Sequence, residues 1–238
     1  MHNDKIILYQ PPGHPFGLPN MSPFCTKLET YLRMAGLPYE ARNADLRKAP
    51  KGKIPYVDLG GKIMGDSQLI IEHLEQTRDK PLDQGLSPAQ RARGHVVRRM
   101  LEEGTYFIGV YLRWSRDDGF ALIRPEIKRV LPGPLALLLP LIRRKVRASL
   151  QAQGVGRHTD AEIQALGQAD LSALSALLGD SLYFLGDEPH IVDAAAYAFV
   201  EGISRFPLDS QVQRHLKTLT NLMAFRDRVR GRYWAELS

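Results

Sequence analysis

Strand-like segments occur only in roughly the first eighty residues of this chain, and from Ser87 onward every periodic segment has helical spacing. The strand-like runs lie at 5–10, 37–42, 54–59 and 62–65, and a Gly-Gly pair joins the last two as a tight hairpin. Helices are expected after the first and the last of these strands, which makes a compact α/β unit of ordinary domain size. The sequence therefore predicts an α/β domain over 1–79, a linker over 80–86 and an all-helical domain over 87–238.

Start and stop signals divide the second part of the chain into helices. Ser87-Pro88 supplies an N-cap and a favoured first residue, and Asp117-Asp118-Gly119 is expected to break the long helix that follows. Helices are predicted at about 87–116, 120–131, 135–152, 159–179, 193–204 and 210–231.

The segment Ser22-Pro23-Phe24-Cys25 begins the first predicted helix, over 22–35. Serine is a strong N-cap and proline is the preferred first helical residue. The segment also looks like a redox Cys-x-x-Cys motif in which a hydroxyl replaces the first sulfur. Because the chain has a single cysteine, an intramolecular disulfide cycle is excluded. The expected chemistry is therefore the handling of another molecule's thiol.

The composition is that of an ordinary globular protein, with 44% hydrophobic and 24% charged residues among 238. A single cysteine fits a reducing compartment. No signal peptide is evident, because only four apolar residues separate Lys5 from Gln10. The longest apolar run, 131–142, is broken by prolines and is shorter than the ~20 residues of a membrane span. We therefore expect a cytoplasmic protein without a transmembrane segment.

A net charge of +6 raises the question of nucleic-acid binding. The basic residues are scattered at spacings that give solvated helix faces, and no basic motif interleaved with aromatic residues accompanies them. We expect no nucleic-acid partner. The basic cluster over 143–147, beside the apolar run, leaves one alternative open, which is contact with an anionic membrane surface.

Four short motifs occur in an order that resembles the soluble glutathione S-transferase superfamily. They are Ser22-Pro-Phe-Cys25, Lys53-Ile54-Pro55, Asp66-Ser67 and, in the helical part, Glu188-Pro-His-Ile-Val-Asp193. The longer segments 22–33, 50–56 and 65–71 look like the branch that contains the failed-axon-connections and metaxin-like proteins. The resemblance covers essentially the whole chain. It implies the glutathione transferase fold, with an α/β thioredoxin-like N-terminal domain followed by an all-α C-terminal domain.

The resemblance implies a glutathione site in the first domain. The proline that corresponds to Pro55 is cis in this family, and the Ile54 backbone would hold the cysteinyl part of glutathione as an added strand does. Lys53 matches a position that approaches the glycyl carboxylate, and Lys51 is a substitute for it. The alternatives are a plain proline at the start of a strand and two solvated lysines.

Asp66-Ser67 is expected at a helix N-terminus, which attracts carboxylates. In the family this pair holds the γ-glutamyl end of glutathione: the hydroxyl and N–H bind its carboxylate and the acidic side chain binds its ammonium. Many classes have Glu where this chain has Asp66, so the reach is shorter. The alternative is an ordinary N-cap, a role that Ser67 can also fill.

Ser22 is the predicted catalytic residue. A hydrogen bond from its hydroxyl to the glutathione sulfur, at ~1.5–3 kcal/mol, would lower the thiol pKa by roughly one to two units. The alternative is a pure capping role, because both roles compete for one oxygen, and Tyr9 is then the second candidate hydroxyl. Cys25 falls on the apolar face of the helix, which favours a buried small side chain over a reactive thiol.

The resemblance implies a glutathione transferase with glutathione as co-substrate, no metal, and a detoxification role. The glutathione thiolate would attack a small electrophile or a peroxide. The long helix after the linker would build the electrophile side, where Tyr106, Tyr111, Arg113 and Trp114 lie. By family analogy the protein is expected to be a homodimer. The alternative is a non-catalytic binding or adaptor protein with the same fold, like the metaxin-like relatives.

Two further features follow from the same comparison. The family has a Ser/Thr-x-x-Asp capping box in its second domain, and here His190 stands at the cap, so Asp193 supplies half of the box and is expected to be structural. The Pro/Gly-rich loop over 11–20 is longer than the connection typical of catalytic classes. It is expected either to cover the glutathione site or to obstruct it.

Overall fold

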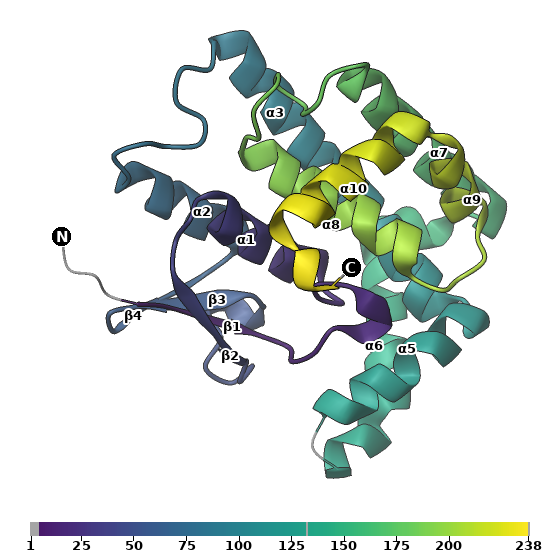
Figure 1. The fold of residues 1–238 in the computed structure, drawn as a ribbon. Helices are drawn as coiled ribbons and strands as arrows, with labels where there is room; N and C mark the ends of the chain where they lie inside the picture. The colour runs from purple at the N-terminus through teal and green to yellow at the C-terminus, as the bar shows by residue number, and fades with distance from the viewer. Residues whose placement is uncertain (1–4, 132, 238) are drawn as a thin grey trace.

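A small mixed sheet forms the centre of the N-terminal part of the computed structural model, which describes residues 5–131 and 133–237 (Figure 1). The strands are β1 (Ile6–Gln10), β2 (Tyr39–Asn43), β3 (Tyr56–Leu59) and β4 (Lys62–Gly65), in the order β2-β1-β3-β4. β1 is parallel to β2 and antiparallel to β3, and β4 returns from β3 as a hairpin. The helices α1 (Pro23–Met34) and α2 (Ser67–Gln76) complete this part of the fold. All four predicted strands and both helices are confirmed.

The two faces of β1 have different surroundings. Leu8 is fully buried with Leu28 of α1 and Ile70 of α2, so this face of the sheet packs against the helices. Tyr9, the next residue, points to the other face, as alternation in a strand requires, and its ring stacks on Tyr56 at 4.6 Å between centroids. The face that Tyr9 occupies is therefore opposite to the one covered by α1.

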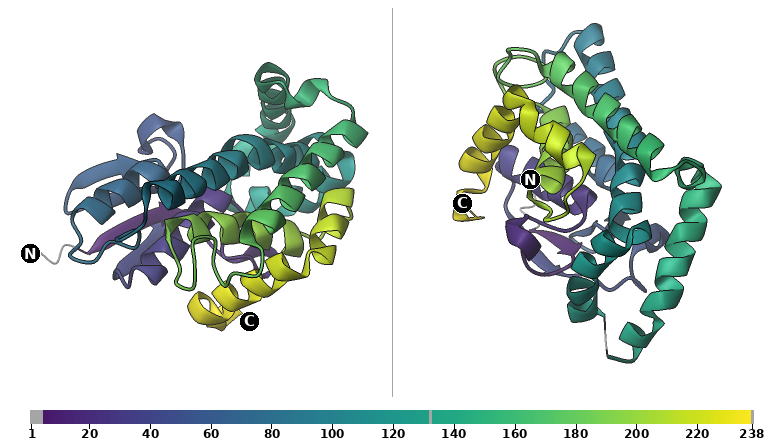
Figure 2. Two further views of the ribbon diagram at one scale, coloured as in Figure 1. Left: turned by 90° about the horizontal axis from the view of Figure 1, so that it is seen from above. Right: turned by 90° about the vertical axis from the view of Figure 1, so that its right-hand side faces the viewer.

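The C-terminal part is entirely helical within the described residues (Figure 2). Its helices are α3 (Pro88–Arg99), α4 (Tyr106–Val110), α5 (Asp117–Val130), α6 (Leu139–Gln153), α7 (Asp160–Leu178), α8 (Ile191–Arg205), α9 (Gln211–Thr218) and α10 (Thr220–Tyr233). Wider π-type turns over Met100–Thr105 and Tyr111–Ser115 join α3 and α4 to a single long rod. None of these helices, as far as the structure describes them, is both long and apolar enough to cross a bilayer.

Two helix boundaries differ from the predictions. The long rod ends at Arg116, which is extended, and Asp117 and Asp118 form the first turn of α5, where acidic side chains favour the helix dipole. Gly119 allows the sharp corner, because a Cβ there would lie 1.9 Å from the carbonyl oxygen of Leu112. The predicted helix 210–231 is two helices, since Leu219 departs from helical geometry between α9 and α10.

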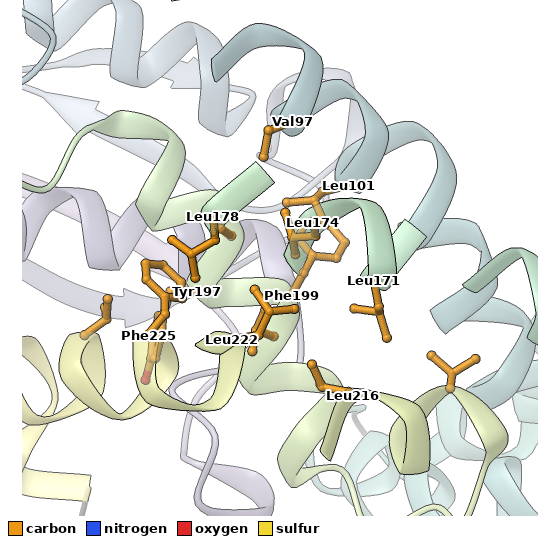
Figure 3. Close-up of a cluster of buried hydrophobic side chains, with 14 of the residues drawn as sticks. Val97, Leu101, Leu171, Leu174, Leu178, Tyr197, Phe199, Leu216, Leu222 and Phe225 are labelled. Carbon is orange, nitrogen blue, oxygen red and sulfur yellow. The ribbon is translucent and has the colours of Figure 1, made fainter. Parts of the chain in front are cut away.

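A large apolar cluster fills the helical part, and Figure 3 shows its centre. The labelled side chains come from the long rod and from α7 to α10: Val97, Leu101, Leu171, Leu174, Leu178, Tyr197, Phe199, Leu216, Leu222 and Phe225. α8 is buried along most of its length and packs against α1 of the sheet part. The first helix and the second core thus share one interface.

Asp193 accepts hydrogen bonds from two backbone N–H groups at the buried start of α8. One carboxylate oxygen accepts a hydrogen bond from the N–H of His190 at 2.8 Å, and the other accepts one from the N–H of Phe184 at 2.9 Å. The N–H of Asp193 itself bonds to the backbone carbonyl of His190. The prediction of a half capping box with a structural Asp193 is therefore confirmed.

Lys27 joins the two parts through a buried charge that the sequence patterns did not reveal. It lies on α1 with no exposed surface, and its ammonium pairs with Glu102, which also pairs with Arg98 at 2.8 Å. A further bond, 2.8 Å long, runs to the side-chain oxygen of Gln68 on α2. Desolvation lowers the pKa of Lys27, and the neighbouring Glu102 opposes that shift.

The loop over 11–20 turns toward the helical part. The ring of Phe16 meets Phe206 edge to face at 5.4 Å between centroids, and Leu18 is buried. Arg230 of α10 donates a hydrogen bond to the carbonyl of Gly17 at 3.3 Å. The loop is thus held against the second domain.

Candidate functional site

One edge of the sheet gathers the predicted glutathione residues. Tyr56 at the start of β3 pairs with Gly65 at the end of β4, so Pro55 and Asp66, the residues just beyond this pair, are neighbours. Tyr56 also pairs with Tyr9 near the end of β1. The polypeptide therefore brings the beginning of β3 and the ends of β1 and β4 to the same place.

The start of α1 is tied to this edge by Asn20. Its side-chain nitrogen donates to the carbonyl of Pro11, and its side-chain oxygen accepts from the N–H of Ser22, both at 3.0 Å. Asn20 is buried, and both bonds are partly sheltered from water. Asn20 thereby links the N–H of Ser22 to Pro11, the residue that follows β1, and none of the sequence motifs indicates this role.

Ser22 is the N-cap of α1, and its hydroxyl oxygen accepts a hydrogen bond from the N–H of Cys25 at 3.5 Å. This bond is long, and it uses only the acceptor side of the hydroxyl. A hydroxyl can accept and donate at the same time. The capping role and a bond to a ligand's sulfur, which were expected to compete for one oxygen, are therefore compatible.

The Ile54–Pro55 peptide bond is cis, as the resemblance implied. Pro55 is buried and Ile54 is half-buried. Among residues 5–131 and 133–237, neither the N–H nor the carbonyl of Ile54 has a hydrogen-bond partner. The Ile54 backbone thus provides one donor and one acceptor for an extended ligand.

Asp66, and not Ser67, is the N-cap of α2. One of its carboxylate oxygens accepts hydrogen bonds from the N–H groups of Gln68 at 3.0 Å and Leu69 at 3.2 Å, and its φ is +81°. Ser67 is the first helical residue and is buried, and its hydroxyl has no partner within the described part of the chain. The second oxygen of Asp66 and the Ser67 hydroxyl therefore remain available for a ligand.

Lys51 and Lys53 extend from a tight turn over Pro50–Gly52 and are exposed. The turn packs closely on the end of β4, because a Cβ added at Gly65 would lie 3.0 Å from the Cβ of Pro50. Neither lysine forms an ion pair with any described residue. The turn that carries both lysines thus lies against Gly65, the residue before Asp66, and the two ammonium groups are free to meet a carboxylate from solution.

Cys25 and Tyr9 have surroundings that suit structural roles. Cys25 is fully buried, and desolvation raises the pKa of its thiol to about 12, against a smaller opposing effect of the Ser22 hydroxyl. The thiol is therefore protonated at neutral pH. Tyr9 lies on the sheet face opposite to α1, stacked on Tyr56. Within the described residues, no hydrogen bond joins Tyr9 to Ser22.

A largely apolar cavity lies between the two parts, next to Ser22. The 11–20 loop and the start of α1 contribute Leu18, Asn20, Met21 and Pro23; the long rod contributes Thr105, Tyr106, Gly109, Leu112 and Arg113; α8, α9 and the segment between them contribute Ala198, Phe199, Gly202, Ile203, Phe206, Leu208, Ser210 and Gln213. Of the four rod residues named from the sequence, Tyr106 and Arg113 line this cavity and Tyr111 and Trp114 do not.

The described residues include no group of three or more acidic, histidine or cysteine side chains suited to a metal ion. The acceptors and donors at the sheet edge are instead a hydroxyl pair, a carboxylate, a free backbone segment and two ammonium groups. Such a set of groups can donate hydrogen bonds to carboxylates and to a backbone carbonyl and can accept them from an ammonium.

Comparison with known proteins agrees with this architecture. The family model described as glutathione S-transferase N-terminal domain matches residues 23–119, and the one described as glutathione S-transferase, C-terminal domain matches residues 167–229. A solved glutathione S-transferase from Methylobacterium radiotolerans, in complex with glutathione sulfonate, shares the fold with a TM-score of 0.60 at 22% identity, covering 95% of this chain and 90% of that one.

The curated relatives include a protein named as a glutathione S-transferase and proteins with other names. The isoprene-epoxide glutathione S-transferase of Rhodococcus sp. (strain AD45) is 33% identical over 92% of this chain and 95% of that protein. Failed axon connections of Drosophila melanogaster is 35% identical over 82% of this chain but 49% of that protein. Metaxin-3 of Xenopus laevis is 26% identical over 93% of this chain and 75% of that protein.

These matches, with the fold described above, show that the chain belongs to the glutathione S-transferase superfamily. Its relatives include Failed axon connections and the metaxins, as the sequence motifs indicated.

Proposed function

We propose that this protein is a glutathione transferase that adds the glutathione thiolate to a small electrophile, acting in the cytoplasm. The observation that carries the proposal is the set of unused polar groups at one sheet edge. The Ile54 backbone, the Ser67 hydroxyl and one oxygen of Asp66 lack partners within the described residues, and Ser22 has a hydroxyl proton to donate. An apolar cavity for a second substrate adjoins them.

The proposed reaction needs only chemistry that these residues supply. Ile54 binds the cysteinyl backbone, Asp66 and Ser67 bind the γ-glutamyl end, and Lys53 or Lys51 meets the glycyl carboxylate. The Ser22 hydroxyl donates a hydrogen bond to the sulfur, which favours the thiolate. The thiolate attacks an electrophilic carbon, a carbon–sulfur bond forms, and the leaving group departs with the electron pair of the bond it breaks.

The Rhodococcus relative acts, by its name, on isoprene epoxide, and this supports an epoxide as one class of electrophile. In that case the broken bond is a ring carbon–oxygen bond, and the oxygen takes a proton from water. Peroxide reduction is the second use of the site: the thiolate attacks one peroxide oxygen, the O–O bond breaks and the departing oxygen takes a proton. A second glutathione thiol then displaces water from the glutathione sulfenic acid, which gives glutathione disulfide. The similarity to Failed axon connections and to metaxins favours a second candidate, a non-catalytic binding protein with the same fold.

Stabilisation by glutathione tests the binding step of the proposed transferase, and conjugation of a generic aryl halide separates a transferase from a non-catalytic binding protein. Asp66 is the residue to vary for the binding step. We expect millimolar glutathione to raise the melting temperature of the wild type. Asp66→Asn keeps an N-cap but removes the negative charge that would meet the ligand's ammonium, so we expect affinity to fall about ten- to a hundred-fold. Asp79→Ala is the matched control, because Asp79 is an exposed acid that forms no ion pair among the described residues. No stabilisation of the wild type would contradict the transferase.

We further propose that the protein forms a homodimer through α2 and α3. Both helices expose a large apolar side chain, with Leu69 46% and Val96 60% accessible. Light scattering should give about twice the chain mass of 26.8 kDa. Val96→Asp should reduce it toward the monomer, because a charge in an apolar interface is costly. Leu182→Asp, at an exposed leucine in a loop of the helical part, should not. A wild-type monomer would contradict the proposal.

A further inference from the structure

Arg113 lines the cavity between the domains, and its guanidinium has no acidic partner in the part of the chain that the structure describes. Its Nη1 donates to the carbonyl of Met21 at 2.9 Å and its Nε to the carbonyl of Gly109 at 3.0 Å. Within residues 5–131 and 133–237, no carboxylate lies within ion-pair distance of it. Other sheltered arginines differ, since Arg98 pairs with Glu102 and Arg230 pairs with Glu201.

The surroundings of Arg113 make an unpaired charge unfavourable. The described residues that line the cavity are mostly apolar, and Arg113 is the charged one among them. Desolvation lowers the pKa of its guanidinium, which reflects this cost. An isolated cation in an apolar site is stabilised strongly by an anion that enters beside it.

We propose that Arg113 binds a carboxylate of the electrophile, so that the second-substrate site takes small electrophiles with an apolar body and a carboxylate group. Two of the five N–H groups of the guanidinium are used by the carbonyls of Met21 and Gly109. The remaining groups suffice for the bidentate geometry that arginine forms with carboxylates. The apolar body then lies against Leu112, Phe199 and Ile203.

Arg113, which would bind the carboxylate, lies next to the start of α1, where the proposed catalytic Ser22 stands. The carbonyl that Arg113 holds belongs to Met21, the residue directly before Ser22. The guanidinium that would hold the carboxylate therefore contacts the peptide group that joins Met21 to Ser22, the proposed catalytic residue. The reaction assigned to this ligand depends on the proposed transferase activity, whereas its binding to Arg113 does not.

A pair of ligands of the same shape tests the binding without any turnover. Isothermal titration calorimetry compares 4-phenylbutyrate with 4-phenylbutyramide on the wild-type protein. We expect the carboxylate to bind about ten- to a hundred-fold more tightly than the amide, because a charge-assisted hydrogen bond replaces a neutral one. Equal affinity of the two ligands overturns the proposal, and this arm needs no variant.

Variants test whether the preference for the carboxylate depends on Arg113 and whether both ligands bind in this cavity. Arg113→Met should abolish the preference for the carboxylate, Arg113→Lys should retain part of it, and Arg99→Met, an exposed arginine on the same rod, should leave it unchanged. Gly202→Leu should weaken both ligands, since Gly202 lines the cavity and a Cβ there meets no atom within 4 Å. A preference that survives Arg113→Met, or unchanged binding in Gly202→Leu, overturns the proposal.

The result that would contradict the proposed transferase differs from the result that would contradict the role of Arg113. If glutathione does not stabilise the protein but the carboxylate preference depends on Arg113, the cavity binds anions without transferase activity. If glutathione binds and is conjugated to an aryl halide while the two phenyl ligands bind equally, the transferase stands and the role of Arg113 is overturned.

Discussion

Ser22→Ala is expected to lower the rate of glutathione conjugation about ten- to a hundred-fold, because it removes a hydrogen bond of ~1.5–3 kcal/mol to the thiolate. The glutathione-induced rise in melting temperature should persist, since Ile54, Asp66 and Ser67 are untouched. The rate of conjugation of a generic aryl halide, measured between about pH 6 and 9, is the assay. In the variant the rising limb of the pH profile should move up by roughly one to two units.

Two controls separate this effect from damage to the helix start. Ser22→Thr retains a hydroxyl and should retain most of the activity. Cys25→Ala should be nearly as active as the wild type, because the buried thiol has a pKa of about 12 and no thiolate at neutral pH. A rate in Ser22→Ala equal to that of the wild type, with the pH profile unmoved, would assign the serine to capping alone.

Asp193→Ala is expected to lower the free energy of unfolding by about 2–5 kcal/mol. The change leaves the buried N–H groups of Phe184 and His190 without their acceptor, at about 1–3 kcal/mol each. Urea denaturation at pH 7.5 measures the effect. Asp187→Ala, at an exposed acid in the preceding loop, should stay within about 0.5 kcal/mol of the wild type. A loss of similar size in both variants would contradict the assignment.

The same residue predicts a pH dependence of stability. Burial raises the pKa of Asp193 to about 7, although its two backbone hydrogen bonds act in the opposite direction. The pKa of an aspartate in the unfolded chain is ~3.9, so the folded state binds the proton more tightly. The contribution of Asp193 to the free energy of unfolding is therefore complete below about pH 4 and is lost as the pH rises through about 7. Asp193→Asn does not titrate. The stability difference between wild type and Asp193→Asn should therefore shrink from about pH 5 to pH 8.

Local signals accounted for the elements that carry the proposed glutathione site. The N-cap and proline at 22–23, the hairpin glycines and the apolar alternation of β1 each act over a few residues, so they could be interpreted from one sequence. Where two neighbouring residues were equally good candidates for a helix cap, the sequence did not distinguish between them. Asp66 caps α2 although Ser67 is an equally favourable cap residue.

The second-substrate cavity could not be predicted, because its walls come from segments far apart in the chain. Leu18 and Met21 meet Phe199 and Gln213 only after the two parts have packed. The sequence placed Arg113 on the long helix among three aromatic residues but could not show that it lacks an acid. The roles of Asn20 and Lys27 likewise depend on partners, and neither residue type has a pattern that indicates burial.

The buried ammonium of Lys27 has a consequence for chimeric proteins. Its partner Glu102 belongs to the helical part, 75 positions later in the chain. If the helical half were exchanged for one from a relative with a neutral side chain at that position, a charge with no exposed surface would lose its counterion, at about 3–5 kcal/mol. The two halves of this protein therefore cannot be recombined freely, even where their backbones superpose.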